Sequence, residues 1–263
     1  MEAPENTLLA FARALELGVD GIELDVQVTR DGVPVVFHDS TLTRLTGTSG
    51  RLADKTWAEL QKLRVQGEPI PTLADALSLT RGHAILQIEI KEGVSVAPVL
   101  AAIRRTASAG NVILASFEHD ILREAAALAP KLPRMLIADK PKTPSQFYTK
   151  VAKIANSSRT QASKHLTTES TKITELRKVS PSSLTPAASR LLQTMSAIGA
   201  SGLSLCHEAI TSPFFVETIH RHGAQLWCWT VNDVLTMKRL SDYAVDAILT
   251  DDPAKLIKIL RVH

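Results

Sequence analysis

The residues best suited to chemistry lie in one stretch, Gly21 to Asp39, where two acids are followed by a histidine. Glu23 and Asp25 alternate with apolar residues from position 22 to 28, which is the two-residue period of a β-strand with one polar face. Both carboxylates therefore point the same way, with Cα atoms about 7 Å apart. Like charges in this arrangement favour a bound cation, and oxygen-only ligands suit Mg²⁺ or Ca²⁺ better than Zn²⁺.

A histidine is expected to return beside these acids. Thr29 to Gly32 connect the strand to the apolar run 33–37, and the Asp-Gly step predicts a tight hairpin with an antiparallel second strand. His38 and Asp39 then lie next to the carboxylates, where His38 is a candidate general acid or base. An isolated acid pair on an exposed strand is more often solvated surface, so this interpretation depends on what the rest of the chain adds.

The strand expected over Ile85–Ile90 adds a third carboxylate and a positive charge. Glu89 and Lys91 share one face, so Glu89 is a further ligand for the cation and Lys91 suits an anionic group such as a phosphate. Trp229, on a later strand, is either part of the core or a wall for an apolar or sugar-like substrate. Three acids, a lysine and a histidine at strand ends describe a metal-assisted phosphoester hydrolase, in which His38 moves a proton and Lys91 offsets transition-state charge.

Strands and helices alternate along most of the chain, which predicts parallel strands with crossover helices. After the acidic strand, the expected strand and helix pairs are Ile85–Ile90 with Val96–Thr106, Val112–Ala115 with His119–Leu128, Arg134–Ala138 with a helix near 146–154, Gly202–Leu205 with Pro213–His220, Gln225–Val231 with Val234–Leu240, and Ala247–Leu249 with Pro253–Leu260. These and the acidic strand make seven parallel strands, whereas a TIM (β/α)8-type barrel has eight. Helix Thr7–Leu17 has no strand before it, so the first strand is expected to be the missing one. The hairpin and the short helices after it form an excursion from the barrel.

Composition favours a single domain over residues 1–263. The chain is 44% hydrophobic, and no run approaches the roughly 18 apolar residues of a membrane-spanning helix. No targeting segment is visible and the two cysteines fall in apolar runs, so a cytoplasmic location is expected.

The segment 140–186 carries most of the positive charge of the chain. It holds nine basic and two acidic residues, a net charge of 9 − 2 = +7, so the rest of the chain carries 3 − 7 = −4. This basic Ser/Thr/Lys-rich segment is expected to be insertion-like, and no nucleic-acid partner is expected.

The order of short motifs adds a resemblance to a known family. The motifs are Pro4-Glu5-Asn6-Thr7, Ile22-Glu23-Leu24-Asp25-Val26, Thr29-Arg30-Asp31-Gly32, Val35-Val36-Phe37-His38-Asp39, Ile70-Pro71-Thr72-Leu73, Ile88-Glu89-Ile90-Lys91, Trp229-Thr230-Val231-Asn232 and Thr250-Asp251-Asp252-Pro253. In this order they resemble the glycerophosphodiester phosphodiesterase family, and its compact bacterial cytosolic enzymes above all. The resemblance covers nearly the whole chain except 140–186.

The resemblance implies an activity and a set of site residues. The activity is release of glycerol 3-phosphate and an alcohol from deacylated phospholipids, a step of glycerol and lipid metabolism with a small-molecule substrate. The implied site holds a divalent cation, Mg²⁺ or Ca²⁺, bound by Glu23, Asp25 and Glu89. It also includes His38 as one of two catalytic histidines, Lys91 as a phosphate contact, Glu5 as a further carboxylate that binds substrate, and Trp229 as a wall of the glycerol pocket.

One part of the family pattern is missing from this sequence. The family begins with a strand ending in His-Arg-Gly, which carries the other catalytic histidine and a phosphate-binding arginine. We therefore expect slow hydrolysis by this chain, as from an N-terminal truncation. The alternatives are a non-catalytic barrel-like binding protein or relic, a lysophospholipase D-like phosphodiesterase, and a nucleic-acid binding module based on 140–186. The sequence leaves open the oligomeric state and the choice between Mg²⁺ and Ca²⁺.

Overall fold

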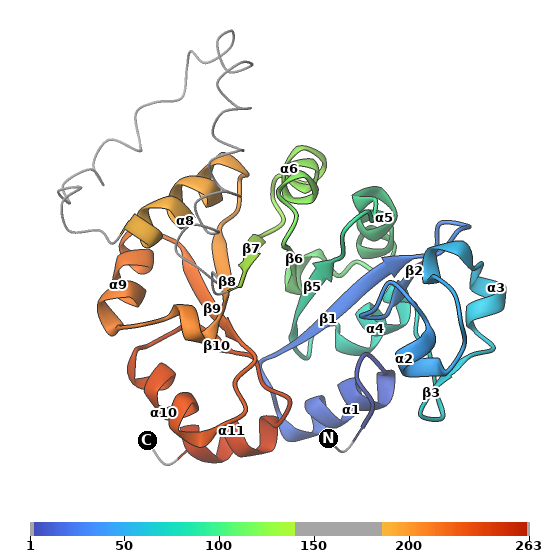
Figure 1. Cartoon of the computed structure of the whole chain (residues 1–263), viewed down its shortest axis with the longest axis horizontal. Coiled ribbons are helices and arrows are strands. Elements are labelled where there is room, and N and C mark those ends of the chain that lie inside the picture. Colours follow the sequence, from blue (N-terminus) through green and yellow to red (C-terminus); the bar gives the residue numbers. More distant parts are fainter. Residues whose placement is uncertain (1–2, 140–185, 262–263) are drawn as a thin grey trace, which may run out of the picture.

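A single curled sheet forms the centre of the fold (Figure 1). The computed structural model describes residues 3–139 and 186–261. In spatial order the sheet is β10-β9-β8-β7-β6-β5-β1-β2, and β2 alone runs antiparallel to its neighbour. The strands are β1 (Gly21–Val28), β2 (Pro34–Val36), β5 (Ile85–Ile90), β6 (Val112–Ser116), β7 (Arg134–Ala138), β8 (Gly202–Cys206), β9 (Gln225–Trp229) and β10 (Ala247–Ile248).

Helices cover the outer, convex side of this sheet (Figure 1). They are α1 (Leu8–Leu17), α4 (Leu73–Thr80), α5 (Val96–Arg105), α6 (His119–Leu128), α8 (Pro186–Ala197), α9 (Pro213–Arg221), α10 (Val234–Asp242) and α11 (Pro253–Leu260). The architecture confirms the predicted TIM-type α/β barrel with seven parallel strands. Within the described ranges, no strand is hydrogen-bonded between β10 and β1, so the sheet is open there.

Burial fixes which face of β1 carries the acids. Leu24 and Val26 are fully buried against the helices in one apolar cluster with Ile88 of β5. Burying each such side chain contributes roughly 1.5–3 kcal/mol. Because side chains alternate along a strand, a slip of one residue would exchange these for Glu23 and Asp25. The apolar face therefore holds the acids on the concave face.

The excursion after β2 has a small core of its own. It contains α2 (Thr43–Thr46), η1 (Leu52–Asp54), α3 (Trp57–Leu60), β3 (Arg64–Val65) and β4 (Glu68–Pro69). Phe37 is 1% exposed in this core, together with Leu42, Leu52 and Leu60. Since Phe37 directly precedes His38, this burial anchors the backbone that carries the histidine.

Some predicted elements differ from the observed ones. The helix α8 was not anticipated, and β9 ends at Trp229 rather than at Val231 because the chain there turns to pair Val231 N–H with the Leu249 carbonyl. The helix expected near 146–154 lies outside the described residues. In the part of the chain that the structure describes, no helix is both long and apolar enough to cross a membrane.

Gly202, the first residue of β8, is predicted to be intolerant of a side chain. A Cβ there would lie 2.9 Å from the Met135 side chain and 3.0 Å from the Gln225 carbonyl oxygen. We expect Gly202→Ala to lower the free energy of unfolding by about 1–3 kcal/mol, because overpacking between strands forces its neighbours to move. Urea unfolding measures this, with Gly110→Ala as the control because that site has open space. Equal stability of both variants would contradict the packing argument.

Candidate active site

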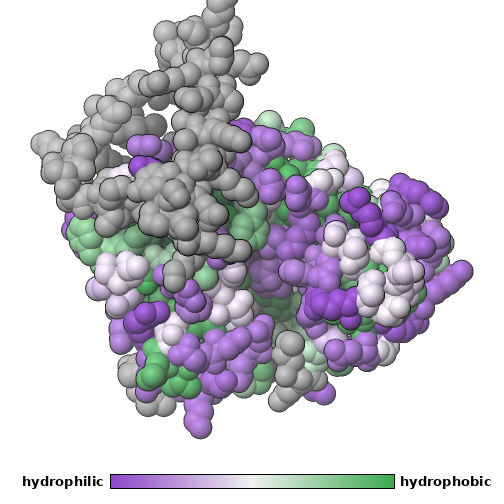
Figure 2. All heavy atoms as spheres, in the orientation of Figure 1, coloured by the Kyte–Doolittle hydropathy of each residue, from purple (hydrophilic) through white to green (hydrophobic). Residues whose placement is uncertain are grey.

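Three carboxylates meet on the concave face of the sheet. Glu23 and Asp25 come from β1 and Glu89 from β5, and each offers an oxygen within 4.8 Å of the other two. The parallel register pairs Asp25 with Glu89 directly, which explains why residues 64 positions apart in sequence meet. In Figure 2, hydrophilic residues border a hollow over the strands at the centre of Figure 1.

Lys91 bridges two of these acids. Its ammonium nitrogen lies 2.6 Å from Asp25 Oδ1 and 2.5 Å from Glu89 Oε1. Burial alone would lower the pKa of Lys91, but Asp25 and Glu89 outweigh burial and raise it. Lys91 therefore stays protonated and provides part of the positive charge that the acids require.

The remaining negative charge is costly. Burial, followed by the charges of Asp25 and Glu89, raises the pKa of Glu23 well above its usual value. Burial also raises the pKa of Glu89, although Lys91 opposes this. At an effective dielectric constant near 20, two unit charges 5 Å apart repel by about 3 kcal/mol. The cluster thus favours an additional cation.

Asn6 positions Asp25 through two hydrogen bonds. The Asn6 amide donates to Asp25 Oδ2 at 2.8 Å, and its carbonyl oxygen accepts from the Asp25 backbone N–H at 3.1 Å. Asn6 has a φ of +56°, a left-handed conformation that asparagine tolerates better than most residues. Asn6 thus holds Asp25, while the Thr7 side chain caps α1.

His38 lies beside the acid cluster, as the hairpin predicted. The Phe37 N–H donates to the Asp25 carbonyl at 2.9 Å, and the Gln27 side chain donates to the His38 carbonyl at 3.3 Å. The charge of His38 also lowers the pKa of Glu89, although burial dominates that pKa. His38 Nδ1 lies 2.7 Å from Asp39 Oδ1.

Arg44 joins Asp39 to Glu5, although no sequence pattern predicted this role. Arg44 donates to both oxygens of Asp39 at 2.7 Å. It also donates to both oxygens of Glu5, at 2.7 and 2.9 Å. Arg44 follows the Thr-rich stretch after His38, where no periodic pattern identifies a functional side chain.

Trp229 and Phe117 form an aromatic pair at the ends of β9 and β6. Their ring centroids are 5.9 Å apart at an interplanar angle of 79°, an edge-to-face contact. The Trp229 indole N–H donates to the Ser204 carbonyl at 3.0 Å, which fixes the ring. Trp227 is 8% exposed and belongs to the core of the concave face.

The loop after β10 lies close enough to the acids to affect them. Asp251 contributes to the raised pKa of Glu23, after burial and the two nearer acids. Asn232 holds this loop, donating to Asp251 Oδ2 at 2.8 Å. Asp252 caps α11 by accepting from the Lys255 N–H.

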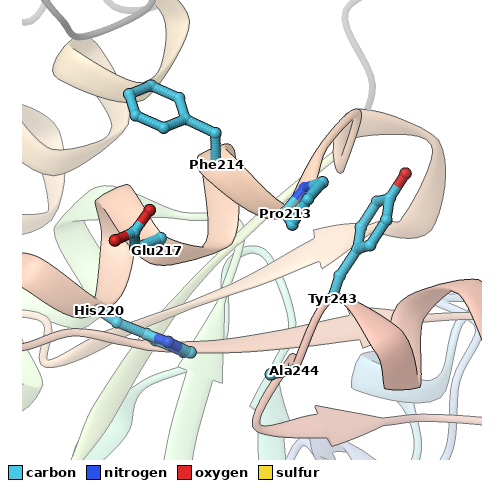
Figure 3. Close-up of a pocket in the computed structure, with 6 residues that line it drawn as sticks. All are labelled: Pro213, Phe214, Glu217, His220, Tyr243 and Ala244. Carbon is cyan, nitrogen blue, oxygen red and sulfur yellow. The ribbon is translucent and has the colours of Figure 1, made fainter.

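A second hollow lies outside the sheet, between α9 and α10 (Figure 3). Its lining consists of Pro213, Phe214, Glu217, His220, Tyr243 and Ala244. His220 Nε2 pairs with Asp246, which directly precedes β10, so this hollow lies toward the amino ends of the strands. It contains none of the predicted site residues.

Acid should weaken the contribution of Asp39 to stability. Hydrogen bonds from Arg44, with a smaller contribution from His38, lower the pKa of Asp39 to about 2, against about 3.9 when unfolded. A carboxylate with a lowered folded pKa stabilises above its unfolded pKa, and this stability is lost as pH falls toward the folded pKa. We expect Asp39→Asn to destabilise the protein more at about pH 5.5 than at about pH 3 in urea unfolding. An equal difference at both pH values would contradict the lowered pKa.

Comparison with known proteins identifies the family. The profile of the Glycerophosphoryl diester phosphodiesterase family matches residues 1–255. A glycerophosphodiester phosphodiesterase of Caldanaerobacter subterraneus is 32% identical over 280 residues, covering 98% of this chain and 93% of that protein. The chain therefore belongs to the glycerophosphoryl diester phosphodiesterase family, which is a family of enzymes.

Solved structures agree on the fold. The glycerophosphodiester phosphodiesterase of Thermotoga maritima has a TM-score of 0.70 at 23% identity, covering 100% of this chain and 93% of the other. A phosphodiesterase of Oleispira antarctica, solved with its product sn-glycerol-3-phosphate, has a TM-score of 0.74 at 22% identity, covering 98% and 92%.

Proposed function

We propose that this chain hydrolyses glycerophosphodiesters in a metal-dependent reaction that releases glycerol 3-phosphate and an alcohol. The observation that carries the proposal is the cluster of Glu23, Asp25 and Glu89 with Lys91 beside it. Family membership supports the reaction type, and the product complex of the Oleispira antarctica relative supports the product class.

The acid cluster fits a hard divalent cation. Its donors are carboxylate oxygens only, and they converge within 4.8 Å. Burial, together with the neighbouring acids, raises the pKa values of Glu23 and Glu89, so the charged forms lack a sufficient counter-charge. Such donors suit Mg²⁺ and Ca²⁺. Bound by Glu23, Asp25 and Glu89, the cation would polarise the phosphate and stabilise transition-state charge.

Lys91 and His38 supply the other charged groups of the proposed reaction. The Lys91 ammonium, already within the acid cluster, would bind a non-bridging phosphate oxygen and offset the charge that develops there. His38 would accept or donate a proton at Nε2, the ring nitrogen that faces away from Asp39. The side chain of His38 is 53% exposed, so it is accessible to a substrate.

Trp229 would form one wall of the substrate pocket, as the resemblance implied. Its N–H donates to the Ser204 carbonyl and its ring packs against Phe117 in an edge-to-face contact. The ring therefore offers an apolar surface in a fixed position. Such a surface suits the carbon atoms of a glycerol or of the alcohol group. The proposed role of Glu5 as a substrate contact is considered below.

Several expectations remain predictions. The first is the single domain over 1–263, which the family match over 1–255 supports. The second is the insertion-like character of 140–186, most of which lies outside the described residues. The third is the cytoplasmic location.

Phosphorus NMR of a glycerophosphocholine reaction tests the proposal. With Mg²⁺ or Ca²⁺ we expect glycerol 3-phosphate and choline, and with EDTA we expect no turnover. Phosphocholine as the product, or turnover that EDTA leaves unchanged, would contradict it. Lysophosphatidylcholine in a parallel reaction tests the lysophospholipase D-like alternative. A version extended by a His-Arg-Gly strand, in the same assay, tests whether such a strand raises the rate.

A further inference from the structure

Four side chains form a continuous polar chain from the segment before α1 to the histidine. Glu5 binds Arg44, Arg44 binds Asp39, and Asp39 binds His38. Each carboxylate accepts two hydrogen bonds from the guanidinium, one pair through Nη1 and Nη2 and the other through Nε and Nη2. This paired geometry fixes the plane of Arg44, and hence the position of Asp39, more firmly than a single charge contact would.

The chain of contacts selects one tautomer of His38. Asp39 Oδ1 accepts from Arg44 Nη2 and lies 2.7 Å from His38 Nδ1. The low pKa of Asp39, about 2, keeps this group a carboxylate, which accepts hydrogen bonds and donates none. A neutral His38 in this position therefore carries its proton on Nδ1, and its Nε2 lone pair is free.

The same segment also reaches the acid cluster. Asn6, the residue after Glu5, holds Asp25 with two hydrogen bonds. One dipeptide thus contacts a carboxylate of the acid cluster through Asn6 and the histidine network through Glu5. Arg44 lies 39 positions from Glu5 in sequence, so these contacts tie the excursion to the segment before α1.

We propose that Arg44 is a positioning residue: anchored by Glu5, it holds Asp39 so that His38 keeps its proton on Nδ1 and presents Nε2 for proton transfer. The proposal rests on the proposed role of His38 in hydrolysis. It assigns Glu5 to the support of Arg44 rather than to contact with substrate. Arg44 is 49% exposed and its two carboxylate partners both belong to this network, so we expect its role to be local.

Kinetics of variants separate positioning from substrate contact. We expect Arg44→Gln and Glu5→Gln to lower kcat by up to about 10²-fold with KM nearly unchanged, as misplacement of a catalytic group does. Arg44→Lys keeps the charge but loses the paired hydrogen bonds, so it should restore only part of kcat. Arg221→Gln, which removes an equally exposed arginine from its pair with Glu217 on α9, is the control and should match the wild type.

Nitrogen-15 NMR of His38, in the metal-free protein without substrate, reads the tautomer directly, with His38→Gln providing the assignment. At alkaline pH, where the ring is neutral, we expect a protonated Nδ1 and an unprotonated Nε2 in the wild type. We expect loss of that preference in Arg44→Gln and its reversal in Asp39→Asn, whose amide would donate to Nδ1.

A protonated Nε2 in the wild type would overturn the proposal. An unchanged tautomer in Arg44→Gln would also overturn it. A higher KM at constant kcat in Glu5→Gln would overturn it as well, because it would indicate that Glu5 contacts the substrate. Absence of hydrolysis would instead contradict the proposed function, and the wild-type tautomer would still decide this inference.

Discussion

Asp25→Asn is expected to lower the rate of glycerophosphodiester hydrolysis by about 10²–10⁴-fold, because a bound metal contributes several kcal/mol of transition-state stabilisation. Asp25 is the most connected member of the cluster: it accepts from Lys91 and Asn6, and it pairs with Glu89 across the two strands. Asparagine keeps the size of the side chain and removes its charge. The measurement is the initial rate of glycerol 3-phosphate release at saturating Mg²⁺ or Ca²⁺.

The matched control is Glu217→Gln, which removes a carboxylate from the outer face of α9. It should keep the wild-type rate. A rate for Asp25→Asn within a fewfold of the wild type would show that the cluster is not the catalytic centre. Circular dichroism of both variants checks that any loss of rate does not come from unfolding.

His38→Gln is expected to lower kcat by about 10²–10⁴-fold, which is the usual contribution of a positioned general acid or base. Metal affinity should change little, because the ring hydrogen-bonds Asp39 and is not one of the three clustered ligands. The measurement is kcat of the variant at saturating metal, together with its affinity for Ca²⁺.

His83→Gln serves as the control, since His83 is exposed in the loop between α4 and β5. Unchanged kcat in His38→Gln would remove the histidine from the proposed reaction. A large loss in His83→Gln as well would indicate a general effect of replacing histidine.

The strands and the acid cluster could be predicted because their signals are local. The alternation from Ile22 to Val28 sets the faces of β1, and the Asp-Gly turn sets the return of His38, so the sequence alone determines that Glu23, Asp25 and His38 are close. Glu89 joined them because carboxyl ends of neighbouring parallel strands lie at one edge of a barrel.

The supporting residues could not be predicted, because they depend on tertiary contacts. Asn6 binds Asp25, which is 19 positions away in sequence. Arg44 binds Asp39 and Glu5, which are 5 and 39 positions away. No periodic pattern in the sequence predicts contacts of this kind. Lys91 was predicted to share a face with Glu89, but its bridge to Asp25 depends on the register of β1 against β5. The helix α8 was not predicted, because the Ser/Thr/Lys-rich composition just before it shows no helical pattern.

Calorimetric titration with Ca²⁺ is the most direct test of the central claim that Glu23, Asp25 and Glu89 form the metal centre. The wild type and Glu217→Gln should bind with equal affinity, and Glu89→Gln should bind at least about tenfold more weakly, because it loses one of three charged ligands. Equal Ca²⁺ affinity in all three proteins would contradict the claim and place the metal elsewhere.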